Sequence, residues 1–282
     1  MQLKNITVIG AGTMGSGITH VFALNNSKVH LIDTDPDCLE KGIKSINANL
    51  DRQLKKGTIT SEQKEVTLAN IKTSSNVGSF PINTELCIEA IIENKSVKLS
   101  LYKQLDQIAS ANCIFASNTS SISITELGTH TRPERFIGMH FMNPVPIMQL
   151  VEIIRGYATS DNTFNIIKQV TIDLGKTPVE VFDYPGFVAN RILMPMINEA
   201  IFALYEGVAS AQDIDTVMKL GMNHPMGPLA LADFIGLDVC LAIMEVLFNG
   251  FSDSKYRPCP LLKKMVSAGK LGRKTNYGFY KY

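Results

Sequence analysis

Apolar residues in the first two thirds of the chain gather in short unbroken runs, a pattern typical of strands buried on both faces of a parallel sheet. The runs occupy residues 6–9, 29–32, 86–88, 113–116, 136–139, 149–153 and 177–182. Between the first two runs, Ile18, Val21 and Phe22 recur with helical spacing. The pattern predicts a Rossmann-type α/β domain built on a mostly parallel sheet.

The segment between the second and third runs differs, because its apolar residues follow the period of an amphipathic helix. They are Leu39, Ile43, Ile46, Leu50 and Leu54, and lysines and arginines lie between them. Gly57-Thr58 interrupts the pattern, so we expect a helical hairpin over about residues 37–70 that stands out from the sheet. Its lysines are typical of a solvated face, and they would also suit the phosphates of a large anionic substrate.

From Val188 onward the strand-like runs stop and helical periodicity takes over. We expect helices over residues 190–206, 211–220, 229–249 and 260–268, separated by Gly and Pro. This change places a domain boundary near residue 184 and gives two domains, 1–184 and 185–282. The second domain carries more apolar residues than about 100 residues can bury alone, so we expect it to form a homodimer interface. An ordinary compact helical domain is the alternative.

The composition excludes several classes of protein. The chain has 282 residues, of which 27 are Lys or Arg and 26 are Asp or Glu, so its charge gives no reason to expect nucleic acid or a membrane surface as partner. Its five cysteines show no CxxC spacing, which indicates neither disulfides nor a metal site and suits a reducing cytoplasm. The first run begins almost at Met1, and no apolar stretch is long enough to span a membrane, so we expect no targeting segment.

A glycine motif lies between the first apolar run and the first helical pattern. It reads Gly10-Ala11-Gly12-Thr13-Met14-Gly15, the GxGxxG spacing of dinucleotide-binding turns. Gly10 would permit a tight turn, Gly12 would let the backbone approach a pyrophosphate, and Gly15 would let the helix pack closely on the strand. The first N–H groups of the helix would then face the anion. We therefore predict that this motif, including Thr13 and Met14, binds a dinucleotide.

A carboxylate ends the second apolar run, at Asp33, eighteen residues after Gly15. An aspartate in this position accepts hydrogen bonds from both ribose hydroxyls and repels a 2′-phosphate. A solvated carboxylate at a strand end is the alternative. Together with the glycine motif, Asp33 predicts that the cofactor is NAD rather than NADP.

An enzyme that oxidises an alcohol with a nicotinamide cofactor needs a base beside the hydroxyl. His140 follows the apolar run 136–139, at the strand edge where open α/β sheets bind ligands. Glu152 comes twelve residues later, inside an apolar run where a carboxylate needs a partner. We predict a pair in which Glu152 orients the imidazole and stabilises its protonated form. A structural histidine at a strand end is the alternative.

Small polar residues follow the fourth run, in the segment Ser117-Asn118-Thr119-Ser120-Ser121. A polar loop or a helix cap is one interpretation. At the ligand-binding edge of the sheet, its hydroxyl groups and the Asn118 amide would instead contact the nicotinamide ribose and a substrate oxygen. We therefore predict that Asn118 and Ser120 take part in cofactor and substrate binding.

Further motifs lie along the rest of the chain. They are Glu89-Ala90-Ile91-Ile92-Glu93-Asn94, His140-Phe141-Met142-Asn143-Pro144, Pro185-Gly186-Phe187-Val188-Ala189-Asn190-Arg191 and His224-Pro225-Met226-Gly227-Pro228. With the glycine motif and the polar loop, they resemble the L-3-hydroxyacyl-CoA dehydrogenase family in order and spacing. The chain is most similar to the bacterial 3-hydroxybutyryl-CoA dehydrogenases, since no hydratase domain is fused to it. The resemblance implies an NAD-dependent enzyme that interconverts (S)-3-hydroxybutyryl-CoA and acetoacetyl-CoA, in fatty acid or butanoate metabolism.

The resemblance also implies roles for single residues. His140 would be the general acid/base and Glu152 its partner, while Ser120 and Asn190 would hydrogen-bond the substrate oxygen. The family's NAD contacts fall here on Asp33, Glu93, Lys98, Asn143 and Lys274. Its CoA contacts fall on the hairpin at Asn49, where a serine is common, and at Lys56.

Two other functions are compatible with the same fold. An NAD-dependent dehydrogenase of a free 3-hydroxy acid or sugar acid would keep the His140–Glu152 pair, but the lysine-bearing hairpin favours an acyl-CoA substrate. A crystallin-like protein would retain the fold without turnover. The presence of Ser120, His140, Glu152 and Asn190 together argues against that alternative, because function depends on the site rather than on the fold.

Overall fold

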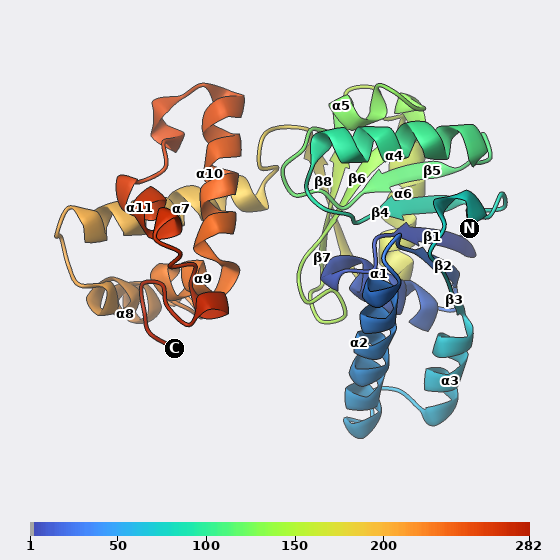
Figure 1. Cartoon of the computed structure of the whole chain (residues 1–282), viewed down its shortest axis with the longest axis horizontal. Coiled ribbons are helices and arrows are strands. Elements are labelled where there is room, and N and C mark those ends of the chain that lie inside the picture. Colours follow the sequence, from blue (N-terminus) through green and yellow to red (C-terminus); the bar gives the residue numbers. More distant parts are fainter. Residues whose placement is uncertain (1–2) are drawn as a thin grey trace. The chain divides into compact units, whose positions relative to one another are not determined.

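The structure is a computed structural model, and it describes residues 3–282. The chain divides into two compact units, one ending at Asp183 and the other running from Tyr184 to Tyr282. The first unit contains the sheet and the second is helical (Figure 1). This arrangement confirms the predicted fold class, a Rossmann-type sheet followed by an all-α region.

One eight-stranded sheet organises the first unit, in the order β3-β2-β1-β4-β5-β6-β7-β8. All neighbouring strands are parallel except β6 and β7, which are antiparallel. The strands are β1 (Asn5–Ile9), β2 (Lys28–Ile32), β3 (Ile71–Ser74), β4 (Leu86–Glu89), β5 (Ile114–Ser117), β6 (Phe136–Phe141), β7 (Leu150–Arg155) and β8 (Thr177–Phe182). The sequence analysis missed β3, because Ile71 is the only apolar residue in this short edge strand.

Helices of the first unit cover the sheet and form the hairpin. They are α1 (Thr13–Leu24), α2 (Pro36–Lys55), α3 (Ser61–Ala69), α4 (Lys95–Ile108), α5 (Ile124–Gly128) and α6 (Asp161–Asp173), with 3₁₀ turns η1 (Val77–Ser79) and η2 (Pro133–Arg135). Apolar residues of α1 and α6, among them Ile18 and Ile167, pack with strand residues such as Val8 in one core. This close packing makes the sheet a rigid support for the loops that follow the carboxyl ends of its strands.

The predicted hairpin is present as α2 and α3, which lie side by side and extend away from the sheet (Figure 1). Thr60 begins α3 with a capping box, since its hydroxyl accepts from the Gln63 N–H and the Gln63 side chain accepts from the Thr60 N–H. Ile46, Leu50 and Ile59 form a small core of their own. In the sequence the hairpin lies between β2 and β3, because α2 follows β2 and α3 leads into β3. These two strands are neighbours at the edge of the sheet.

The second unit consists of helices around a core that includes Ile201, Leu237 and Leu247. They are α7 (Ala189–Tyr205), α8 (Ala211–Gly221), α9 (Pro228–Ile235), α10 (Leu237–Phe251) and α11 (Pro260–Ser267), with 3₁₀ turns η3 (Ser254–Tyr256) and η4 (Arg273–Thr275). The prediction of one helix over residues 229–249 is wrong. Gly236 has a φ of +106°, which a helix cannot contain, and it separates α9 from α10. Within residues 3–282, no helix combines the length and apolarity that a membrane span requires.

Candidate active site

The turn from β1 into α1 depends on two of its glycines. Gly10 has a φ of +103°, and a Cβ added there would lie 2.5 Å from the Ala90 carbonyl oxygen. A Cβ on Gly15 would lie 1.8 Å from the Gly10 carbonyl oxygen. Any side chain at either position would therefore force the turn apart. At Gly12, by contrast, no atom of the described residues other than its immediate chain surroundings lies within 4 Å of the Cβ position, so this part of the backbone is open to a ligand.

The N-terminus of α1 suits an anionic ligand. Among the described residues, no side chain caps this end of the helix, and its first turn holds no acidic residue. The N–H groups of the first turn, which includes Thr13 and Met14, have no acceptors within the helix and carry the positive end of its dipole. The open backbone at Gly12 and these donors fit the pyrophosphate of a dinucleotide.

Asp33 lies just after β2, beside this turn. Its Oδ2 accepts a hydrogen bond from the Ala11 N–H at 2.7 Å, and its Oδ1 accepts one from the Asp35 N–H at 3.0 Å. Two backbone donors thus fix the Asp33 carboxylate beside the glycine turn.

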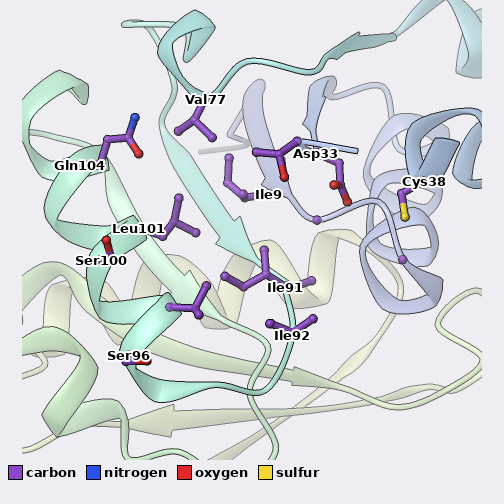
Figure 2. Close-up of a pocket in the computed structure, with 15 residues that line it drawn as sticks. Ile9, Asp33, Cys38, Val77, Ile91, Ile92, Ser96, Ser100, Leu101 and Gln104 are labelled. Atoms are coloured by element: carbon purple, nitrogen blue, oxygen red, sulfur yellow. The ribbon is translucent and has the colours of Figure 1, made fainter. Parts of the chain in front are cut away.

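A cavity of about 680 Å³ opens between this turn and α4 (Figure 2). Asp33 lies on one side, Leu101 and Gln104 project from α4 on the other, and Ile91 lies between them. Among the described lining residues there is no lysine, arginine or histidine to neutralise a 2′-phosphate. The cavity fits the adenosine half of NAD better than that of NADP.

A buried ion pair lies at the end of β4. Lys98 Nζ is 2.5 Å from Glu89 Oε1 and 3.2 Å from Glu93 Oε2, and the Lys98 and Glu89 side chains are only 1% and 0% exposed. Glu89 also accepts hydrogen bonds from the Ile91 N–H and the Ser117 hydroxyl. Lys98 is therefore enclosed by carboxylates, and it links the end of β4 to the loop after it.

Glu93 orders the polar loop that follows β5. Its Oε1 accepts from the Thr119 hydroxyl at 2.5 Å, from the Ser120 N–H at 3.0 Å and from the Ser121 hydroxyl at 2.8 Å. Burial acts to raise the pKa of Glu93, but the Lys98 ammonium and these hydrogen bonds outweigh it and lower the pKa. Glu93 thus stays ionised and fixes the backbone of Ser120.

His140 and Glu152 face each other across the antiparallel pair β6 and β7, where they are direct partners in the register. His140 Nδ1 lies 2.7 Å from Glu152 Oε2, and the two side chains are 10% and 2% exposed. A carboxylate at Nδ1 favours the tautomer with the proton on that nitrogen, so that Nε2 is the basic one. The pairing, which was predicted because a buried Glu152 carboxylate needs a partner, is therefore present in the structure.

Asn118 precedes this pair along the chain, and Asn143 lies between its two members. The Asn118 side-chain oxygen accepts from the Phe141 N–H at 3.0 Å, which ties the polar loop to the end of β6. Asn143 is exposed in the connection from β6 to β7, three residues after His140. The carboxyl edge of the sheet thus gathers the polar loop, the candidate base and Asn143.

The remaining predicted residues lie elsewhere in the fold. Asn49 is half-buried in α2, and Lys56 is exposed directly after that helix. In the helical unit, Asn190 is the second residue of α7, and Lys274 in η4 donates to Asp238 Oδ2 at 2.6 Å.

Sequence reasoning assigned no role to Glu89, although it is a fully buried carboxylate with Lys98, Ser117 and Tyr102 around it. A signal was present, because Glu89 directly follows the apolar run 86–88. A charged residue inside a buried strand needs a partner of opposite charge, and Lys98 follows nine residues later.

Two family models together match almost the whole chain. The model described as "3-hydroxyacyl-CoA dehydrogenase, NAD binding domain" matches residues 5–184, and that of the C-terminal domain matches residues 186–282. A "Probable 3-hydroxybutyryl-CoA dehydrogenase" of Bacillus subtilis is 53% identical, with 100% of this chain and 98% of that protein covered. The mitochondrial hydroxyacyl-coenzyme A dehydrogenase of Homo sapiens is 44% identical, with 99% and 91% covered.

A solved structure agrees with these matches. The crystal structure of an (S)-3-hydroxybutyryl-CoA dehydrogenase from Ralstonia eutropha superimposes with a TM-score of 0.96 at 50% identity, covering 100% of this chain and 99% of that one. The chain therefore belongs to the 3-hydroxyacyl-CoA dehydrogenase family. It is an NAD-dependent oxidoreductase, which confirms the predicted enzyme class and cofactor.

Proposed function

We propose that this protein interconverts (S)-3-hydroxybutyryl-CoA and acetoacetyl-CoA in short-chain fatty acid or butanoate metabolism. The observation that carries the proposal is the buried His140–Glu152 pair, which lies at the same edge of the sheet as the glycine turn. The names of the bacterial relatives support the choice of substrate. When bound, NAD accepts the hydride from C3 of the hydroxyacyl group or, as NADH, returns it to the ketone.

His140 is the proposed general acid and base. With Nδ1–H donating to Glu152, Nε2 takes the proton of the 3-hydroxyl as the ketone forms, and in the reverse direction it returns that proton to the developing alkoxide. Glu152 stabilises the imidazolium that forms in between. Ser120, held by Glu93, and Asn190 at the start of α7 hydrogen-bond the substrate oxygen in this proposal.

The thioester requirement is tested by comparing acetoacetyl-CoA with free acetoacetate as oxidants of NADH. If the CoA group supplies binding energy, acetoacetyl-CoA should have a kcat/KM higher by about 100-fold or more, because interactions remote from the reacting carbon contribute to the rate. Equal rates with the two compounds would favour the dehydrogenase of a free acid.

The hairpin is the proposed site for the CoA phosphates, through Lys56 and Asn49. Lys56 is exposed at the end of α2, where an ammonium can pair with phosphate. The Lys56→Ala variant should raise the KM for acetoacetyl-CoA by roughly 5-fold and leave the KM for NADH unchanged. Lys41→Ala, which removes an exposed lysine from the same helix, is the matched control. An equal rise in both variants would indicate only a general effect of charge.

Cofactor preference depends in this proposal on the Asp33 carboxylate. The Asp33→Ser variant should bind NADH about 10-fold more weakly, because a charged acceptor for the ribose hydroxyls is lost, and should discriminate less against NADPH. Fluorescence titration with both cofactors measures this, with Asp37→Ser as the control from the first turn of α2. An unchanged preference for NADH would show that Asp33 does not set it.

We also propose that the protein is a cytoplasmic homodimer that uses its helical unit as the interface. Large apolar side chains on that unit are exposed in the single chain, including Ile192 at 68%, Leu220 at 82% and Phe234 at 58%. Apolar area of this kind marks an association surface. Light scattering during size-exclusion chromatography should give twice the chain mass, and the monomer mass would contradict the dimer.

A further inference from the structure

The turn that joins β6 to β7 packs against the helix of the glycine motif. Val145 in this turn is 2% exposed, and a Cβ added to Gly17 of α1 would lie 2.9 Å from the Val145 Cβ. The close approach of turn and helix is therefore possible only because residue 17 is glycine. The same turn begins after His140 and carries Asn143, so its position matters for the site.

A buried lysine also contacts this turn, through hydrogen bonds to its main-chain carbonyls. Lys176 Nζ donates hydrogen bonds of 2.7 Å to the carbonyl oxygens of both Val145 and Met148, and the residue is 8% exposed. Within residues 3–282, no carboxylate is in ion-pair distance of this ammonium, and burial lowers the pKa of Lys176. A buried cation without a counter-ion is unfavourable unless its hydrogen bonds are satisfied, so the two carbonyl contacts are the feature that stabilises it.

The backbone of Lys176 is itself fixed by the end of α6. Gly175 has a φ of +70°, its N–H donates to the Ile172 carbonyl, and the Lys176 N–H donates to the Thr171 carbonyl, which is the Schellman pattern. The next residue, Thr177, donates to the Gln149 carbonyl at 2.8 Å and begins β8. Lys176 is thus anchored on both sides and can act as a rigid support for the turn.

We propose that Lys176 is a positioning residue for cofactor binding, since its two hydrogen bonds to the β6–β7 turn preset the backbone that presents Asn143. The inference rests on the proposed function in one respect, the role of Asn143 in binding NAD. Lys176 itself does not touch the cofactor in this proposal. It acts by keeping the turn in its binding conformation before NAD arrives, so that less ordering accompanies binding.

A double-mutant cycle on NADH binding tests this. Lys176→Met keeps an unbranched side chain of similar volume but removes the ammonium group that makes both hydrogen bonds, and it should weaken NADH binding about 5- to 10-fold in fluorescence titrations. Asn143→Ala should weaken it by a similar factor, and the double variant should be little weaker than either single variant, because the two residues act as a unit. Lys168→Met, an exposed lysine on α6, is the matched control and should bind NADH as the wild type does.

Two further measurements separate the proposal from a general loss of structure. Hydrogen exchange of the cofactor-free protein should become faster at residues 142–149 in Lys176→Met and not elsewhere in the sheet. Lys176→Arg, which retains donors, should bind NADH within about 3-fold of the wild type. Additive losses in the cycle, unchanged exchange in the turn, or equal losses in the Met and Arg variants would each overturn the proposal. If Asn143→Ala bound NADH as tightly as the wild type does, the cofactor role of Asn143 would fail instead, while the exchange experiment would still report whether Lys176 holds the turn.

Discussion

The His140→Gln variant is expected to lose activity by about two orders of magnitude or more in kcat, because general base catalysis contributes roughly 10²- to 10⁴-fold. Glutamine retains much of the shape and can still hydrogen-bond Glu152, but it cannot take up a proton near neutral pH. Binding of NADH should stay within about 2-fold of the wild type, since the glycine turn and Asp33 follow β1 and β2 and not the strands that carry His140 and Glu152. Steady-state rates with acetoacetyl-CoA and fluorescence titration with NADH measure the two effects separately.

His130→Gln provides the matched control for this change. His130 is exposed in the loop after α5, so its replacement should leave both kcat and NADH binding unchanged. If His140→Gln turned over at a near-normal rate, His140 would not be the general acid/base, and another proton donor would have to be sought at the sheet edge.

The Lys98→Met variant should lose about 3 kcal/mol or more in the free energy of unfolding, because it leaves the Glu89 carboxylate buried without its counter-ion. The remaining hydrogen bonds from the Ser117 and Tyr102 hydroxyls and the Ile91 N–H only partly compensate a fully buried charge. For a protein of this size, a loss of that order lowers Tm by roughly 6–12 °C. Thermal and urea denaturation followed by circular dichroism would measure it.

Lys95→Met, on the same helix, is the control for Lys98→Met. Lys95 pairs with Glu126 at 2.8 Å, but both side chains are about half exposed, so the pair is screened by water. Its loss should change the free energy of unfolding by less than about 1 kcal/mol. Equal effects of the two substitutions would mean that the buried pair at the end of β4 does not stabilise the fold.

Much of the sheet could be predicted because its strands are buried on both faces and leave unbroken apolar runs in the sequence. The edge strand β3 lacks such a run, since its four residues are exposed or only half-buried and need not be apolar. The break at Gly236 was missed for the opposite reason. Apolar periodicity continues through it from α9 into α10, and only the positive φ of one residue separates the helices.

The site likewise has contacts that could be predicted from the sequence and contacts that could not. The pairing of His140 with Glu152 was predictable because a buried carboxylate requires a partner, and the antiparallel strands place these two residues opposite each other. The hydrogen bonds of Lys176 could not be predicted, because their acceptors are main-chain carbonyls 31 and 28 residues earlier in the chain. Every residue has such a carbonyl, so the residue types give no indication of which one is used. Side chains that act through the backbone become visible only in the folded structure.

The central claim is that this protein transfers hydride between NAD(H) and C3 of an acyl-CoA. It is tested most directly by incubating the protein with acetoacetyl-CoA and NADH that carries deuterium at the transferable position of nicotinamide C4, followed by mass spectrometry of the product. The account predicts (S)-3-hydroxybutyryl-CoA with a single deuterium at C3, formed by the wild type and not appreciably by His140→Gln. An unlabelled product, or no conversion of the thioester, would contradict it.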